Sequence, residues 1–86
     1  MYKVILSPQA LQDVANLDKG VARRIIGKID WLAENFDVIT PIALTGTLSD
    51  FYKLRVGHWR VIYSLNHKTE TININRIKHR SEAYKQ

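Results

Sequence analysis

The 86-residue sequence contains no cysteine. Disulfide bonds and thiolate metal sites are therefore excluded, which suits a protein of a reducing compartment. A metal site would have to use histidines and carboxylates. The three histidines, His58, His67 and His79, are widely spaced and form no H-x-x-x-H or H-E-x-x-H pair. We therefore expect no metal and no other cofactor.

Long apolar segments are also lacking. The first ten residues, MYKVILSPQA, contain one lysine and only a short apolar run, too short for a signal peptide. No stretch approaches the roughly 20 apolar residues of a membrane-spanning helix. We therefore expect a cytoplasmic protein that makes no contact with a membrane.

The sequence has few of the motifs on which common enzymes depend. The four glycines are scattered, so there is no glycine-rich phosphate loop, and no serine lies in a G-x-S-x-G motif. The second half of the chain has no pair of carboxylates that could serve as acid and base. If the protein is an enzyme, cationic and phenolic side chains must carry the chemistry.

Positive charge is present in excess and is unevenly distributed. The net charge is +5. Residues 1–50 contain five Lys/Arg and six Asp/Glu, whereas residues 51–86 contain eight Lys/Arg, two Asp/Glu and all three histidines. A basic half beside a nearly neutral half suggests a surface that faces a polyanion. The alternative is a solvated basic face without a ligand.

The stretch YKLRVGHWRVIY, residues 52–63, predicts a β-hairpin with a two-residue type II′ turn at Gly-His. Alternation along the strands then places Lys53, Arg55 and Arg60 on one face, with Arg55 directly opposite Arg60. Like charges in such a pair repel each other. A bound phosphate would convert this repulsion into joint attraction. The alternative is that both side chains splay into water.

The remaining elements predict a single α+β domain over residues 1–86. Ser7 and Pro8 have the residue types of a helix N-cap and first turn, and Arg76 falls in phase with the isoleucines before it, which predicts a bulge or strand end nearby. We expect a strand, a helical hairpin and then a mainly antiparallel sheet, with the helices on one face and the cationic face open. The predicted segments are a strand at 2–6, helices from Pro8 and over 21–36 separated by a turn at 17–20, a short strand at 42–44, the hairpin, and a strand at 69–77.

The hairpin, followed by a strand and the tail RIKHRSEAY, resembles the RelE/ParE superfamily of type II toxin–antitoxin toxins over nearly the whole chain. It is more similar to RelE, an mRNA interferase that cuts mRNA in the ribosomal A site, than to ParE-type toxins, which share the fold but inhibit DNA gyrase. The resemblance implies a ribosome-dependent, metal-independent endoribonuclease that inhibits translation. It also implies a cognate RelB-like antitoxin as partner. The alternatives are a gyrase inhibitor that is not an enzyme, or an inactive relative that serves as a binding module.

The resemblance also implies roles for individual residues. Lys53 would activate the RNA 2′-hydroxyl, Arg60 would stabilise the phosphorane, and Arg55 would hold the backbone. Tyr84 would stack on or orient a nucleotide, although it could instead tether the tail. The group that protonates the leaving oxygen stays open, since His79 is chemically attractive but Lys78 or Arg80 also match the basic tail. The basic residues that would bind RNA are Arg76, Lys78 and Arg80.

Overall fold

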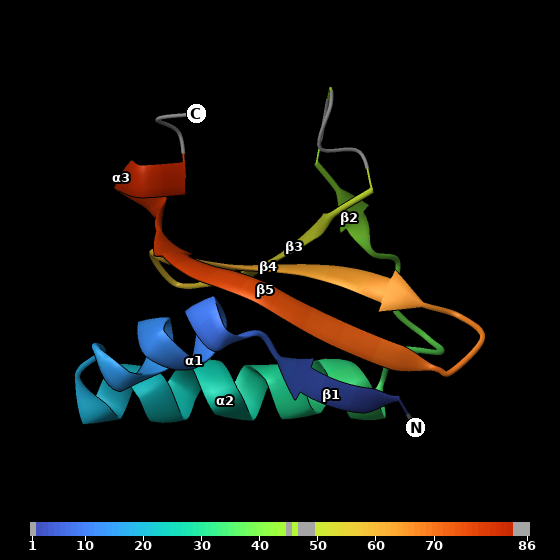
Figure 1. The fold of residues 1–86 in the computed structure, drawn as a ribbon, viewed down its shortest axis with the longest axis horizontal. Coiled ribbons are helices and arrows are strands. Elements are labelled where there is room, and N and C mark those ends of the chain that lie inside the picture. The colour runs from blue at the N-terminus through green and yellow to red at the C-terminus, as the bar shows by residue number, and fades with distance from the viewer. Residues whose placement is uncertain (1, 45, 47–49, 84–86) are drawn as a thin grey trace.

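The computed structural model describes residues 2–44, 46 and 50–83, and these form a helical layer packed on a five-stranded sheet (Figure 1). The strand order is β1-β5-β4-β3-β2, and every neighbouring pair is antiparallel except β1 with β5. The α+β prediction is therefore confirmed. The elements are β1 (Lys3–Leu6), α1 (Pro8–Ala15), α2 (Lys19–Glu34), β2 (Ile42–Ala43), β3 (Tyr52–Val56), β4 (Trp59–Asn66), β5 (Thr71–His79) and α3 (Arg80–Ala83).

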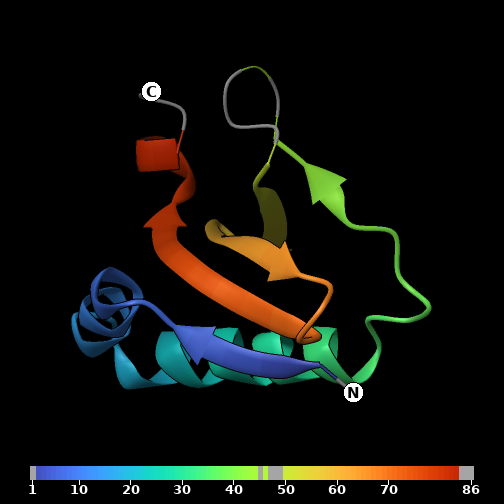
Figure 2. The ribbon, with the colours of Figure 1, turned by 45° about the vertical axis from the view of Figure 1, so that its right-hand side comes forward.

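The helical hairpin covers one face of the sheet (Figure 2). The apolar stripe of α2 enters the core because its side chains recur at helical spacing. The strands contribute the facing side chains, since alternate residues of each strand point toward the helices. The largest fully buried side chains are Tyr63, Ile25, Ile29, Leu32, Ile72, Ile74 and Val61.

Polar side chains start both long helices. The Ser7 hydroxyl accepts a hydrogen bond from the backbone N–H of Ala10 at 3.0 Å, which confirms Ser7 as the N-cap of α1. Asp18 caps α2 by accepting the N–H of Gly20 at 3.1 Å. Because this cap starts the helix at Lys19, the prediction that Gly20 belongs to the preceding turn is wrong.

The β3–β4 hairpin has the predicted register. Arg55 pairs with Arg60 across a two-residue turn at Gly57 and His58. Gly57 has a φ of +59°, whereas His58 has no positive φ, and this combination is that of a type II′ turn. The charge conflict inferred from the sequence is therefore present in the backbone register.

A β-bulge in β5 confirms the irregularity predicted near Arg76. Ile62 pairs with Arg76, but the next residue, Tyr63, pairs with Ile74, so Asn75 is the extra residue. One extra residue shifts the alternation of the strand by one position. The isoleucines before the bulge face the helices, and Arg76 after it lies on the opposite face with Ile62.

The two ends of the sheet hold features that the sequence pattern did not predict. Strand β1 pairs in parallel with β5, and α3 continues directly from β5. Both α3 and the β2 end of the sheet rise on the side away from α1 and α2, so they flank the open face (Figure 1). Among the described helices, none is sufficiently long and apolar to cross a membrane.

Candidate nucleic-acid interface

A row of cations crosses three adjacent strands on the open face. Arg60 of β4 lies directly opposite Arg55 of β3 on one side and directly opposite Lys78 of β5 on the other. Directly opposed residues of antiparallel strands have Cα atoms about 4.5–5.5 Å apart. We call Arg55, Arg60 and Lys78 the cation row. Like charges directly opposite each other on neighbouring strands are destabilising. The row is therefore suited to an anion that offsets this repulsion.

Arg60 lies at the centre of the cation row and is buried, with only 5% of its surface exposed. The alternation of the hairpin predicted it on an open face, and its burial follows from its place on β4, the middle strand of the sheet, between β3 and β5. Arg55 is exposed and Lys78 is intermediate. The row thus presents one fixed charge between two more accessible ones.

Lys53 lies on the same face as the cation row, two residues from Arg55 along β3. It pairs with Ile62 of β4 and with Ile42 of β2. Its position is therefore one step along the sheet from the row. A phosphate held by the row would leave Lys53 beside the neighbouring part of the same nucleotide.

His79 does not join the cation row. It pairs with Trp59, and the two rings meet edge to face with centroids 5.1 Å apart on the helix-facing side of the sheet. Its Nδ1 is 3.0 Å from the Ser81 hydroxyl. Of the two adjacent residues considered as proton donors, the structure places Lys78 on the cationic face and His79 on the other.

The structure describes Arg80, the next basic residue of the tail, but not Tyr84. Arg80 is exposed at the start of α3, and its backbone N–H donates to the carbonyl of His58 at 2.7 Å. This bond ties the tail to the hairpin turn. Tyr84 lies outside the described residues, so its predicted role stays a prediction.

Arg76 is held by an ion pair with Asp13 of α1. Its Nε is 2.9 Å and its Nη2 3.2 Å from the two carboxylate oxygens, and the N–H of Ile77 donates to the same carboxylate at 2.8 Å. Burial raises the pKa of Asp13, but the hydrogen bonds from Arg76 and Ile77 and the charges of Arg76 and Lys78 outweigh it and hold the pKa below its usual value. Arg76 was predicted to bind RNA. Its guanidinium contacts Asp13, but its side chain is 43% exposed and lies on the open face, so this role stays a prediction.

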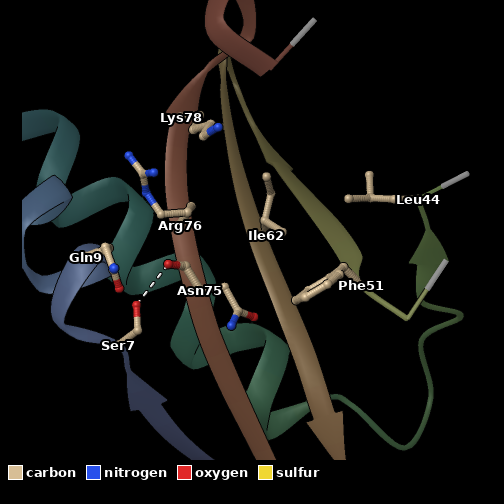
Figure 3. Close-up of a pocket in the computed structure, with 8 residues that line it drawn as sticks. All are labelled: Ser7, Gln9, Leu44, Phe51, Ile62, Asn75, Arg76 and Lys78. Atoms are coloured by element: carbon tan, nitrogen blue, oxygen red, sulfur yellow. Dashed lines mark hydrogen bonds between the residues drawn. The ribbon is translucent and has the colours of Figure 1, made fainter. Parts of the chain in front are cut away.

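A cavity of about 300 Å³ adjoins the cation row on the open face (Figure 3). Ile62 lies on its floor, and Lys78 belongs both to its lining and to the row. Ser7, Gln9, Asn75 and Arg76 line it from the β5 side, and Leu44 and Phe51 line it from the β2 side.

Sequence reasoning missed the cavity and Asp13. Asp13 and Arg76 are 63 residues apart, and the cavity joins the start of α1 to the β3 edge. A single acid in a helix or an asparagine in a strand carries no signal of such distant contacts. In the part of the chain that the structure describes, no group of three or more His, Asp or Glu side chains could hold a metal ion.

The family profile described as the ParE toxin of the type II toxin–antitoxin system, parDE, matches residues 4–84. The chain belongs to the ParE toxin family. The resemblance to the RelE/ParE superfamily is thereby confirmed, and the protein is a type II toxin. No curated protein matches its sequence.

Solved structures of other toxins share the fold of this ParE family member. The RelE–RelB complex from Pyrococcus horikoshii OT3 is 36% identical, with 92% of this chain and 94% of that chain covered and a TM-score of 0.67. The RelBE2 complex from Mycobacterium tuberculosis is 21% identical, with 92% and 98% covered and a TM-score of 0.81. The isolated E. coli RelE toxin is 20% identical, with 99% and 97% covered and a TM-score of 0.77.

Proposed function

We propose that this toxin is a ribosome-dependent endoribonuclease that cuts mRNA in the ribosomal A site and so inhibits translation. The observation that supports the proposal is the cation row, Arg55–Arg60–Lys78, across the open face. Arginine binds phosphate through a planar fork of donors, and Arg60 is held in place by its burial in the middle of the sheet. The row therefore suits the charge that a phosphate gains during cleavage.

The substrate supplies its own nucleophile in this reaction. The 2′-oxygen gives its proton to a base and bonds to phosphorus, the bond to the 5′-oxygen breaks, and that oxygen takes up a proton. The products are a 2′,3′-cyclic phosphate and a 5′-hydroxyl. The protein must orient the 2′-oxygen in line with the leaving oxygen and stabilise the phosphorane, without a metal.

Each cation of the open face has a role in this proposal. Arg60 stabilises the phosphorane, Arg55 holds the RNA backbone, and Lys53 activates the 2′-hydroxyl. Lys78 protonates the leaving oxygen, because it shares the face of Arg60 whereas His79 lies on the other face. Arg80 binds the RNA backbone beyond the scissile phosphate, and Tyr84 stacks on a nucleotide.

An antitoxin is the proposed inhibitor. Several similar structures are complexes of a toxin with its antitoxin, among them the Pyrococcus horikoshii complex. An acidic segment that folds on binding would neutralise the basic half of this chain. The negative charge of such a partner would complement the net charge of +5 on this chain.

The test is primer extension on an mRNA translated in a purified system. Wild type is compared with Lys78→Ala and Arg60→Ala, and Lys68→Ala in the exposed β4–β5 loop is the control for loss of one charge. We expect ribosome-dependent cuts from wild type and Lys68→Ala, and a loss of at least about 100-fold in the other two variants. Because Arg60 is buried, the folding of Arg60→Ala is checked by circular dichroism. If Arg60→Ala does not fold, the conclusion rests on Lys78→Ala.

Inhibition of DNA gyrase is the second candidate. The family profile carries the ParE description, and α2 exposes Trp31 beside β3, with the Lys28 ammonium 4.1 Å from the ring centroid. An exposed aromatic ring is a feature of protein-binding surfaces. If folded wild type makes no cuts but blocks supercoiling, and Trp31→Ala removes the block, the ribonuclease proposal is wrong.

A further inference from the structure

The cavity beside the cation row has the composition of a site for one flat, polar-edged group. Its floor is Ile62 and one wall holds the Phe51 ring, whereas the opposite wall carries the side chains of Gln9 and Asn75 (Figure 3). Two cations, Arg76 and Lys78, complete the lining on the side of the cation row. A volume of about 300 Å³ is at the lower end for ligand pockets, so it takes one small group and not an oligonucleotide. An apolar floor with a few polar groups on one side fixes the orientation of such a group.

Asn75 supplies the most specific feature of the cavity. Its side-chain oxygen Oδ1 is buried and accepts no hydrogen bond from the part of the chain that the structure describes. Its backbone carbonyl already accepts the Ser7 hydroxyl at 2.8 Å, and its place in the β-bulge fixes the backbone. A buried acceptor without a donor lowers stability by about 1–3 kcal/mol. Rotation of the side-chain amide about its soft terminal torsion would turn this oxygen toward the cavity, where a ligand N–H would remove that cost.

The cation row and the cavity are spaced so that the row could hold the phosphate of a nucleotide and the cavity its base. Ile62 on the cavity floor and Arg60 in the row are two residues apart on the same face of β4, about 7 Å along the strand. Lys78 belongs to both. A phosphate on the row would therefore leave its own or the adjoining base above the cavity.

We propose that this cavity is the base-specificity pocket of the toxin, in which one unstacked RNA base lies against Phe51 and donates its exocyclic amino group to Asn75 Oδ1. Adenine, guanine and cytosine carry such a group, and uracil does not. Stacking on an aromatic side chain is the usual way in which proteins hold an unpaired RNA base. The inference rests on the proposed ribonuclease function and adds which bases the site accepts.

The first test measures cleavage on ribosomes programmed with A-site codons that vary one position at a time. Wild type is expected to cut at least about tenfold more slowly when uridine occupies one position, because a specific base contact contributes 1–3 kcal/mol of discrimination. Asn75→Ala is expected to reduce this preference to within about twofold. The matched control is Asn73→Ala, which removes the same side chain two residues earlier in β5, outside the cavity, and keeps the preference. If wild type cuts mRNA and Asn75→Ala leaves its preference intact, the pocket assignment is wrong while the ribonuclease proposal holds.

A second measurement is independent of cleavage. The side-chain NH₂ signals of Asn75 are followed by NMR while 2′-O-methyl trinucleotides, which cannot react, are added to wild type. We expect these signals to shift with adenosine, guanosine or cytidine at the central position and not with uridine. A shift in a protein that cuts no mRNA supports the pocket and refutes the ribonuclease proposal. If the signals respond to an antitoxin peptide and to none of the trinucleotides, the cavity receives a protein side chain and the inference is overturned.

Discussion

Tyr63 shows how a single side chain couples the core to pH. Its phenol is buried opposite Tyr52, with ring centroids 5.6 Å apart. Burial, followed by the effect of Tyr52, raises the pKa of Tyr63 to about 12. The neutral phenol is therefore the form that the fold accommodates.

Stability should fall in alkali because of Tyr63. Between the usual pKa of 10.0 and about 12, the unfolded chain loses the phenol proton while the folded chain keeps it, so the free energy of unfolding decreases as pH rises. The full loss is about 3 kcal/mol. Urea unfolding of Tyr63→Phe on both sides of this interval should lack that loss, whereas the control Tyr2→Phe should keep it. Equal slopes in wild type and Tyr63→Phe would contradict the assignment.

Asp13 acts at the acid end of the pH range. Its pKa is lowered in the folded state, so its contribution to stability is present above the usual value of 3.8 and is lost as pH falls through the lower folded value. Asp13→Asn should lower the free energy of unfolding by about 2 kcal/mol near neutral pH. The difference from wild type should shrink below the folded pKa. Asp30→Asn, on the exposed side of α2, serves as the control and should change stability little at either pH.

At the scale of elements, two glycines should respond in opposite directions to the same substitution. Gly57 has a φ of +59°, and an added Cβ would lie 2.7 Å from Arg24 Nη2, whereas a Cβ on Gly27 in α2 meets nothing within 4 Å. Gly57→Ala should therefore destabilise the protein by about 1–2 kcal/mol. Gly27→Ala should stabilise it by about 0.5–1 kcal/mol, because alanine favours helix interiors. Thermal unfolding of the two variants tests this, and a stabilised Gly57→Ala would refute the type II′ turn.

Local signals account for the elements that the sequence predicted. Gly57 and His58 specified the hairpin turn, Ser7 and Pro8 specified the start of α1, and the phase of Arg76 specified the bulge. Each of these depends on residues close together in the chain. The parallel pairing of β1 with β5 joins Lys3 to Thr71, and no local pattern encodes that neighbour.

The candidate site also combines features that the sequence predicted with features that only the tertiary structure revealed. Arg55 and Arg60 could be paired from the hairpin alone, but the choice between Lys78 and His79 depended on how β5 aligns with β4 beyond the bulge. The cavity required the position of α1 relative to β5, which is set by Ser7 at one end and Asp13 at the other. Such contacts come from tertiary packing, so the sequence alone did not reveal them.

At the scale of the whole molecule, the fold concentrates charge that the sequence distributes along its second half. The C-terminal strands place Lys53, Arg55, Arg60 and Lys78 on one face of the sheet, while α1 and α2 cover the other. A face of this kind binds a polyanion largely through the release of its counterions. Salt dependence therefore reports how many of these cations reach phosphate.

Binding of single-stranded RNA should weaken steeply with salt. If the four cations each neutralise one phosphate, the plot of log K against log salt concentration should have a slope of about −3, since each contact contributes about −0.7. Lys78→Gln should make the slope shallower by about 0.7, and Lys68→Gln, in the β4–β5 loop away from this face, should leave it unchanged. Fluorescence anisotropy of a labelled RNA over a series of potassium chloride concentrations measures both. An unchanged slope in Lys78→Gln would mean that RNA does not lie across the cation row, and would favour a toxin that acts through its helical face.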